Sequence, residues 1–215
     1  MTGERRRVSA VATLIAINTG IFLYQSLSPA ADDRLLDLYA LSSGGIEQGR
    51  WWQLITYAFL HANIWHLLFN MIGLWFAGRI VERVMGKGRF LALYAACAVA
   101  GGLAQLLFDS GQSLLLGASG AVCGVIVAFA TMFPEAQIVA LLFFVIPLRF
   151  RAKYLGWGLT GSSLLFLVLG FEPWIGHAAH FGGCVAGYLL ARFNGYGVPS
   201  PPERLLMKWR SSRAT

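Results

Sequence analysis

Charged residues are scarce in this chain: Asp, Glu, Lys and Arg make up 13% of its 215 residues, about half the share of a soluble globular domain. With 57% hydrophobic residues and a mean hydropathy of +0.61, the composition excludes a disordered chain and indicates a membrane protein. Cysteine is scarce as well. Cys97, Cys123 and Cys184 all lie in apolar runs, which excludes a disulfide-stapled secreted domain and predicts free, buried thiols.

The net charge of +7 would suit nucleic acid, but the basic residues lie between and beyond the apolar runs, so no nucleic-acid partner is expected. A bilayer core of roughly 30 Å takes about 20 helical residues. Six apolar runs are predicted to be transmembrane helices: 8–26, 64–84, 90–108, 117–133, 153–171 and 174–193. The run 137–148 is too short to cross and is expected to be a buried or interfacial connection.

The basic residues indicate how these spans are oriented. With six spans, 15 of the 17 Lys and Arg residues fall on one side, and only Arg34 and Arg50 on the other. Positive residues mark the cytoplasmic side, so both termini are predicted to be cytoplasmic. The expected organisation is a basic tail over 1–7, a six-span domain over 8–193, and a basic tail over 194–215 against anionic lipid.

The first apolar run has a second interpretation. Three arginines and an apolar run ahead of Ser28-Pro29-Ala30 also suit a cleaved signal peptide. Its removal would leave five spans, so we favour a retained helix. Residues 27–63 then form a long loop rich in Gly and Trp, and Trp51 and Trp52 are expected to anchor it at the lipid headgroups.

Polar side chains within spans carry the strongest indication of function, because each is costly in a bilayer unless it is buried, paired and used. All four histidines and one serine lie where spans start at the outer face: His61, His66, Ser119, His177 and His180. The span 117–133 is short, about 25 Å of helix. Its start is therefore predicted to lie below the outer surface, which places Ser119 level with His180.

Small residues recur at four-residue spacing on two of these spans, as Gly120, Gly124, Gly183 and Gly187. Such faces let helix backbones approach closely and would bring Ser119 within hydrogen-bond distance of His180. A serine beside a histidine is typical of a nucleophile and its general base. Taken singly, the serine is also explained as an N-cap and the glycines as ordinary packing.

His66 and Asn70 are four residues apart and share one helix face. With the backbone N–H of Ser119 they can donate hydrogen bonds to a developing oxyanion, although a structural pair is the simpler interpretation of these two alone. No carboxylate is expected beside His180, so we expect a dyad. Two other classes stay open: a metal or haem held by the four histidines, and a non-catalytic scaffold or transporter.

Three segments together resemble the signature of the rhomboid intramembrane serine proteases: HANIWHLLFN at 61–70, GASG at 117–120 and AHFGGCVAG at 179–187. GRWWQLITYAFLHA at 49–62 and GRIVE at 78–82 resemble the same family's first loop and second helix. The resemblance covers about residues 8–193. It implies an all-α membrane protein, a six-transmembrane-helix rhomboid bundle with a long interfacial first loop and both termini cytoplasmic.

The resemblance also implies a role for each matched residue. Ser119 would be the nucleophile, His180 the general base and acid, and His66 and Asn70 the oxyanion donors. Structural residues near the site would be His61, Gly117, Gly120, Gly183 and Gly187. No cofactor and no metal are implied.

Substrates of the resembled family are transmembrane proteins, here expected to be single-pass, cut near the outer side of the bilayer after passing between the second and fifth helices. The implied location is a bacterial or archaeal cell membrane, as a multi-pass protein with the active site towards the outer face. A catalytically inactive relative that binds membrane proteins as a scaffold is the alternative.

Two residues depart from the family's pattern. Gln53 stands where many members carry Arg, which is expected to alter how the first loop is held. Cys123 stands where several members carry an aromatic residue that stacks on the histidine, so His180 is expected to be less constrained and the S1 pocket wider. His177 stands where other side chains occur and has no assigned role.

Overall fold

The computed structural model describes residues 8–108, 113–142, 146–171 and 176–197, so most of the two expected basic tails lies outside the described residues. Helices occupy all six expected ranges: α1 (Ala10–Gln25), a continuous helix made of α5 (Ile64–Gly73), η2 (Leu74–Gly78) and α6 (Arg79–Met85), then α7 (Lys87–Phe108), α8 (Ser119–Met132), α9 (Ala152–Leu169) and α10 (His177–Phe193). Three helices in the described part are long and apolar enough to cross a membrane: Ile64–Met85, α7 and α9. The apolar helices α1 and α8 are shorter.

One carboxylate holds α1 against α6. Glu82 accepts hydrogen bonds from Ser9 Oγ and from the first two backbone N–H groups of α1, at 2.6 to 3.0 Å. These N–H groups have no partner within their own helix and favour a negative charge, so Glu82 caps α1 from a neighbouring helix. At the other end of α1, Gln25 Oε1 accepts the backbone N–H of His61 at 3.1 Å. Both ends of α1 are thereby held against the rest of the chain.

The long helix over 64–85 is not uniform. Leu74–Gly78 form a π-helical segment, which is a wide turn produced by one extra residue in the helix. At the end of this turn, Gly78 lets α1 approach, because a Cβ there would lie 3.0 Å from Val11 Cγ2.

Residues 27–63, expected to be a loop, contain four short helices: α2 (Pro29–Tyr39), α3 (Ser43–Glu47), α4 (Gln53–Thr56) and η1 (Tyr57–Phe59). Side chains hold them together by bonding to main-chain carbonyls. Trp52 Nε1 donates to the carbonyl of Leu38 at 2.8 Å, and Thr56 Oγ1 to that of Tyr39 at 2.9 Å. The rings of Trp51 and Trp52 remain largely exposed, which suits an interfacial position.

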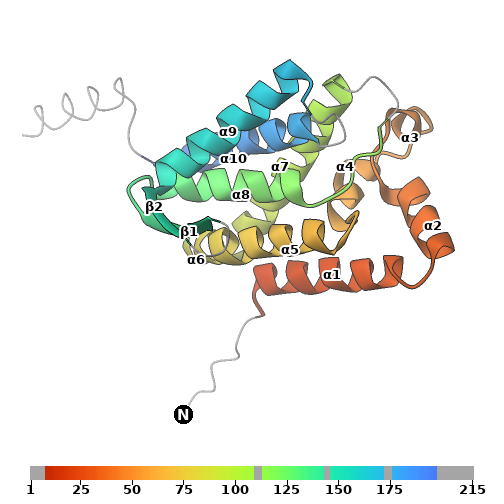
Figure 1. Cartoon of the computed structure of the whole chain (residues 1–215), viewed down its shortest axis with the longest axis horizontal. Coiled ribbons are helices and arrows are strands. Elements are labelled where there is room, and N and C mark those ends of the chain that lie inside the picture. Colours follow the sequence, from red (N-terminus) through yellow and green to blue (C-terminus); the bar gives the residue numbers. More distant parts are fainter. Residues whose placement is uncertain (1–7, 109–112, 143–145, 172–175, 198–215) are drawn as a thin grey trace, which may run out of the picture.

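The expected connection over 137–148 is a β-hairpin. β1 (Gln137–Leu142) and β2 (Ile146–Arg151) pair antiparallel, with Gln137 opposite Arg151. Figure 1 shows the hairpin at one end of the bundle and α2, α3 and α4 at the other. The two kinds of connection therefore mark opposite ends of the helices.

The core is built around α8. Ten of its 14 residues are buried, so this helix is enclosed by protein on nearly all sides and requires small residues at its contacts. α10 contacts α7, α8 and α9, and α8, α9 and α10 run alongside one another above α5 (Figure 1). The residues at the start of α8 are thereby placed inside the bundle.

Candidate active site

Ser119 is the first residue of α8, at the bundle end where the first-loop helices gather (Figure 1). Fourteen helical residues rise about 21 Å, which is less than the thickness of a bilayer core. The segment before Ser119 bonds to the first loop: Leu115 and Leu41 exchange N–H···O bonds at 2.8 and 2.9 Å, and the Gly117 N–H donates to the Tyr57 carbonyl at 2.9 Å. Irregular backbone at membrane depth requires such internal partners.

The structure brings Ser119 and His180 together. Ser119 Oγ lies 2.7 Å from His180 Nε2, within the range of a nucleophile and its base. His180 is one turn into α10, which begins at His177. When Nε2 accepts the serine proton, the proton of the neutral ring is on Nδ1.

The contact between α8 and α10 is made by backbone. We call the four glycines at this contact the α8–α10 seam: Gly120, Gly124, Gly183 and Gly187. A Cβ on Gly183 would overlap the carbonyl group of Gly120, and a Cβ on Gly187 that of Gly124. At these four positions the nearest atoms across the contact are main-chain atoms, so main-chain packing sets the spacing of the two helices that carry Ser119 and His180.

His66 and Asn70 lie on α5, whose N-terminus is capped by Asn63 Oδ1 accepting the His66 N–H at 2.9 Å. A Cβ on Gly117 would overlap the imidazole of His66, so the ring lies directly against the backbone ahead of Ser119. Gly117 also has φ +114°, a conformation that favours glycine. The buried amide of Asn70 donates one hydrogen to the His66 carbonyl at 2.9 Å, and a second N–H of that group remains.

The other two histidines, His61 and His177, lie beside His66 and His180 respectively. His61 is 2% exposed, and its ring centroid lies 5.1 Å from that of His66. Burial lowers the pKa of His61 to about 4, so this ring is neutral at neutral pH. His177 is buried, with its ring edge-on to His180 at 6.2 Å and to Phe166 at 5.3 Å between centroids.

In the described part of the chain, no carboxylate pairs with either histidine of α10. Glu82 caps α1, and Glu135 pairs with two basic side chains beside the hairpin. The described ranges, which include all four histidines, contain no group of three or more His, Cys, Asp or Glu residues arranged to hold a metal ion. Two further acids, Asp109 and Glu172, lie outside the described residues.

Tyr57 supports the site and was not identified from the sequence. Its side chain is 1% exposed, and its hydroxyl donates to the carbonyl of Ala98 in α7 at 2.8 Å. Because its own carbonyl accepts the Gly117 N–H, Tyr57 ties the segment before Ser119 to α7. It lies in the segment 49–62 that resembles the family's first loop, but nothing in that segment assigns it a role.

The structure shows what surrounds Gln53 and Cys123, the two residues that depart from the family's pattern. Gln53 is buried at 1% exposure, and its Nε2 lies 3.3 and 3.4 Å from the carbonyl oxygens of Asp37 and Leu38, so it holds the first loop from inside. Cys123 lies one turn after Ser119 in a buried cluster with Cys184. The ring contact with His180 comes instead from His177.

Comparison with known proteins gives a consistent result. The rhomboid domain family model matches residues 48–196. The chain is 34% identical over 147 residues to rhomboid protease GluP of Bacillus subtilis, covering 68% of this chain and 26% of the relative. It is 32% identical over 119 residues to the putative rhomboid protease YdcA of the same organism, covering 55% and 60%.

A third relative is a mitochondrial protein. Mitochondrial rhomboid protein 1 of Saccharomyces cerevisiae is 33% identical over 164 residues, covering 71% of this chain and 44% of the relative. The chain thus spans between about a quarter and three fifths of the length of these three relatives.

Proposed function

The chain belongs to the rhomboid family of integral membrane proteins, and from this premise we propose that it is an intramembrane serine endopeptidase acting on transmembrane protein substrates. The observation that carries the proposal is the 2.7 Å contact between Ser119 Oγ and His180 Nε2. That contact lies at the start of a central helix in an apolar bundle, where an unused serine and histidine would be costly.

In the proposed reaction, His180 Nε2 removes the hydroxyl proton of Ser119 as Oγ attacks the carbonyl carbon of the scissile peptide bond. The C–N bond then breaks, and His180 gives its proton to the leaving amine, which leaves an acyl-enzyme on Ser119. Water, deprotonated by His180, attacks the ester and restores both residues. The proposed dyad needs no carboxylate as a third member to orient His180, because the α8–α10 seam fixes the helix that carries this histidine.

The oxyanion of the tetrahedral intermediate would form beside the N-terminus of α8. The backbone N–H of Ser119 lies at the positive end of the helix dipole, and the His66 ring lies against Gly117, two residues before Ser119. The second N–H of the Asn70 amide is the third donor in the proposal. Preorganised donors of this kind act mainly on the transition state.

We further propose six membrane spans with cytoplasmic termini, since that arrangement puts 15 of 17 basic residues on one side, the side that positive residues mark as cytoplasmic. Ser119 and His180 are at the opposite bundle end from the hairpin, so cleavage is proposed near the outer side of the bilayer, in single-pass substrates. A bacterial or archaeal cell membrane is the proposed location.

Labelling with a serine-reactive fluorophosphonate tests the proposal on the detergent-solubilised protein. We expect the wild type to be labelled, and Ser119→Ala and His180→Ala to lose the label while remaining helical. Ser163→Ala is the matched control, because Ser163 is also buried but its hydroxyl bonds to the Leu159 carbonyl in α9. Label retained by Ser119→Ala refutes the dyad. A folded wild type without label or cleavage of a transmembrane substrate favours the inactive scaffold.

A further inference from the structure

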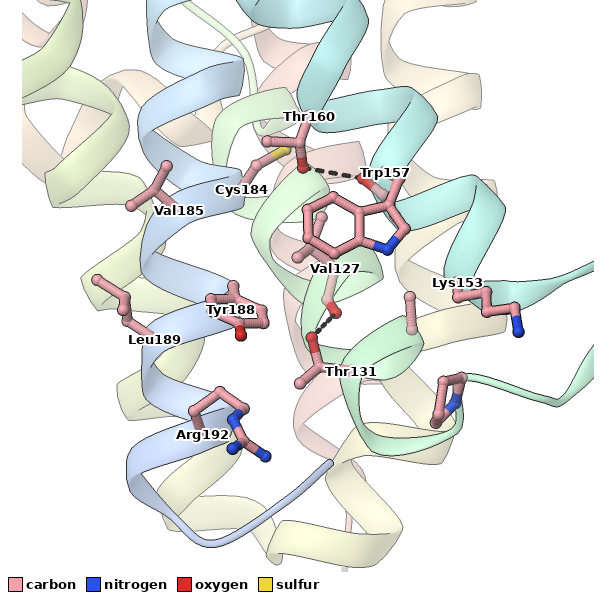
Figure 2. Close-up of a pocket in the computed structure, with 13 residues that line it drawn as sticks. Val127, Thr131, Lys153, Trp157, Thr160, Cys184, Val185, Tyr188, Leu189 and Arg192 are labelled. Atoms are coloured by element: carbon pink, nitrogen blue, oxygen red, sulfur yellow. Dashed lines mark hydrogen bonds between the residues drawn. The ribbon is translucent and has the colours of Figure 1, made fainter. Parts of the chain in front are cut away.

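A groove separate from the proposed active site opens between α8, α9 and α10. Its cavity measures about 410 Å³, within the range of small-molecule sites. Figure 2 shows α9 and α10 as its two sides, with α8 forming the floor. Its lining includes Thr131, Lys153, Trp157, Thr160, Val185 and Arg192.

The groove presents a mostly apolar surface, although some of the residues that line it are polar. Thr131 Oγ1 donates to the Val127 carbonyl and Thr160 Oγ1 to the Gly156 carbonyl, both at 2.8 Å (Figure 2). Both hydroxyls are therefore engaged by their own helices. Trp157 is 70% exposed at the mouth, so the groove opens on the outer surface of the bundle, where a membrane protein meets acyl chains.

The two basic residues of the groove lie towards one end of it. α9 and α10 run antiparallel, so Lys153 in the first turn of α9 and Arg192 in the last turn of α10 are at the same end of the bundle (Figure 2). From Arg192 to Cys184, α10 rises about 12 Å. The groove thus combines an apolar channel with a cationic end, which matches one acyl chain and an anionic head group.

One anion is already present at this end. Lys153 Nζ lies 2.7 Å from Glu135 Oε1, and Arg151 Nη1 lies 2.7 Å from Glu135 Oε2. The exposed carboxylate of Glu135 shows that this end of the groove attracts a negative group, and a phosphate bound there would compete with it.

We propose that the α8–α9–α10 groove binds an anionic phospholipid from the leaflet on the basic side of the membrane. One acyl chain lies along Val185 and Trp157. The head-group phosphate meets Lys153 and the planar guanidinium of Arg192, whose Nη1 also donates to the Tyr196 carbonyl at 3.2 Å. Basic pockets between membrane helices recognise anionic head groups in this way. The site uses neither Ser119 nor His180, so it stands or falls independently of the proposed protease activity.

Quenching of Trp157 fluorescence tests the proposal with the full chain in vesicles. Phosphatidylcholine vesicles carry a minor fraction of lipid with brominated acyl chains, which is either phosphatidylglycerol or phosphatidylcholine. The Trp157→Phe variant, measured in parallel, isolates Trp157 from the other six tryptophans. We expect stronger quenching by brominated phosphatidylglycerol.

Variants on each part of the groove should shift this preference in different directions. Lys153→Gln and Arg192→Gln should each weaken it roughly fivefold, the equivalent of about 1 kcal/mol per cation near an anionic lipid. Glu135→Gln should strengthen it by removing the competing carboxylate, and Val185→Phe should reduce it by narrowing the channel. Arg89→Gln, an exposed arginine in the first turn of α7, should leave it unchanged.

Three results would overturn the proposal. Equal quenching by the two head groups would mean that the groove does not select an anionic lipid. A preference that survives in the Lys153→Gln/Arg192→Gln double variant would place the selection elsewhere. Equivalent quenching by a brominated free fatty acid would make that molecule the occupant instead.

Discussion

Adding a single methyl group to the α8–α10 seam tests whether backbone contact sets the geometry of the site. In Gly183→Ala, the new Cβ would overlap the Gly120 carbonyl group. The carbonyl is main chain and the Cβ is attached directly to the other helix's backbone, so relief requires the helices to separate by about 1 Å to reach an ordinary C···O contact. Over-packing of this kind costs about 1–3 kcal/mol, against up to ~1 kcal/mol gained from the higher helix propensity of Ala.

Gly158→Ala is the matched control, because Gly158 is also helical but a Cβ there meets nothing within 4 Å. The control is expected to keep or raise the thermal unfolding temperature in detergent, whereas Gly183→Ala is expected to lower it.

The seam variant should also slow fluorophosphonate labelling of Ser119 by about 100-fold, the effect of misplacing a catalytic group by ~1 Å. A Gly183→Ala protein that unfolds and reacts like the wild type would refute the reasoning, since it would show that the seam does not position His180.

Two further predictions concern His66 and Asn70 of α5, and His61 in the segment before it. His66→Ala and Asn70→Ala are each expected to lower kcat for a transmembrane substrate by about 100- to 1,000-fold with little change in KM, and an effect on KM alone would contradict the oxyanion role. Because burial lowers the pKa of His61 to about 4 from 6.5, the unfolded chain binds more protons between these values. The contribution of His61 to the free energy of unfolding is therefore full above pH 6.5 and declines as the pH falls towards 4. Thermal unfolding of His61→Gln should lose this part of the pH dependence, and an unchanged profile would argue against a buried neutral ring.

The sequence was most informative about residues whose presence in an apolar helix costs free energy or packing area. Ser119, His180 and the seam glycines stand out because polar and small residues in apolar helices require a reason. Their meeting follows from helix order and four-residue spacing. The six helices follow from long apolar runs, which few other structures can satisfy.

Features that depend on tertiary contacts were not predictable in the same way. The cap on α1 by Glu82 joins residues more than 70 positions apart, and the role of Tyr57 depends on which carbonyl it reaches. The short helices of the first loop are held by side-chain bonds to main-chain carbonyls, which produce no periodic pattern. The pairing of β1 with β2 was missed because a short apolar run looks the same in a strand as in a buried connection.

The π-helical turn over Leu74–Gly78 sets the phase between two halves of one helix. α5 presents His66 towards the segment that leads into α8, whereas α6 presents Glu82 towards α1. Each residue of an α-helix advances about 100° around the axis, so winding the same number of residues as a regular α-helix, without the wide turn, would rotate α6 by about that angle relative to α5. Glu82 would then point away from the start of α1 while His66 kept its place. The length of this turn, more than the identity of its residues, allows one helix to serve both contacts.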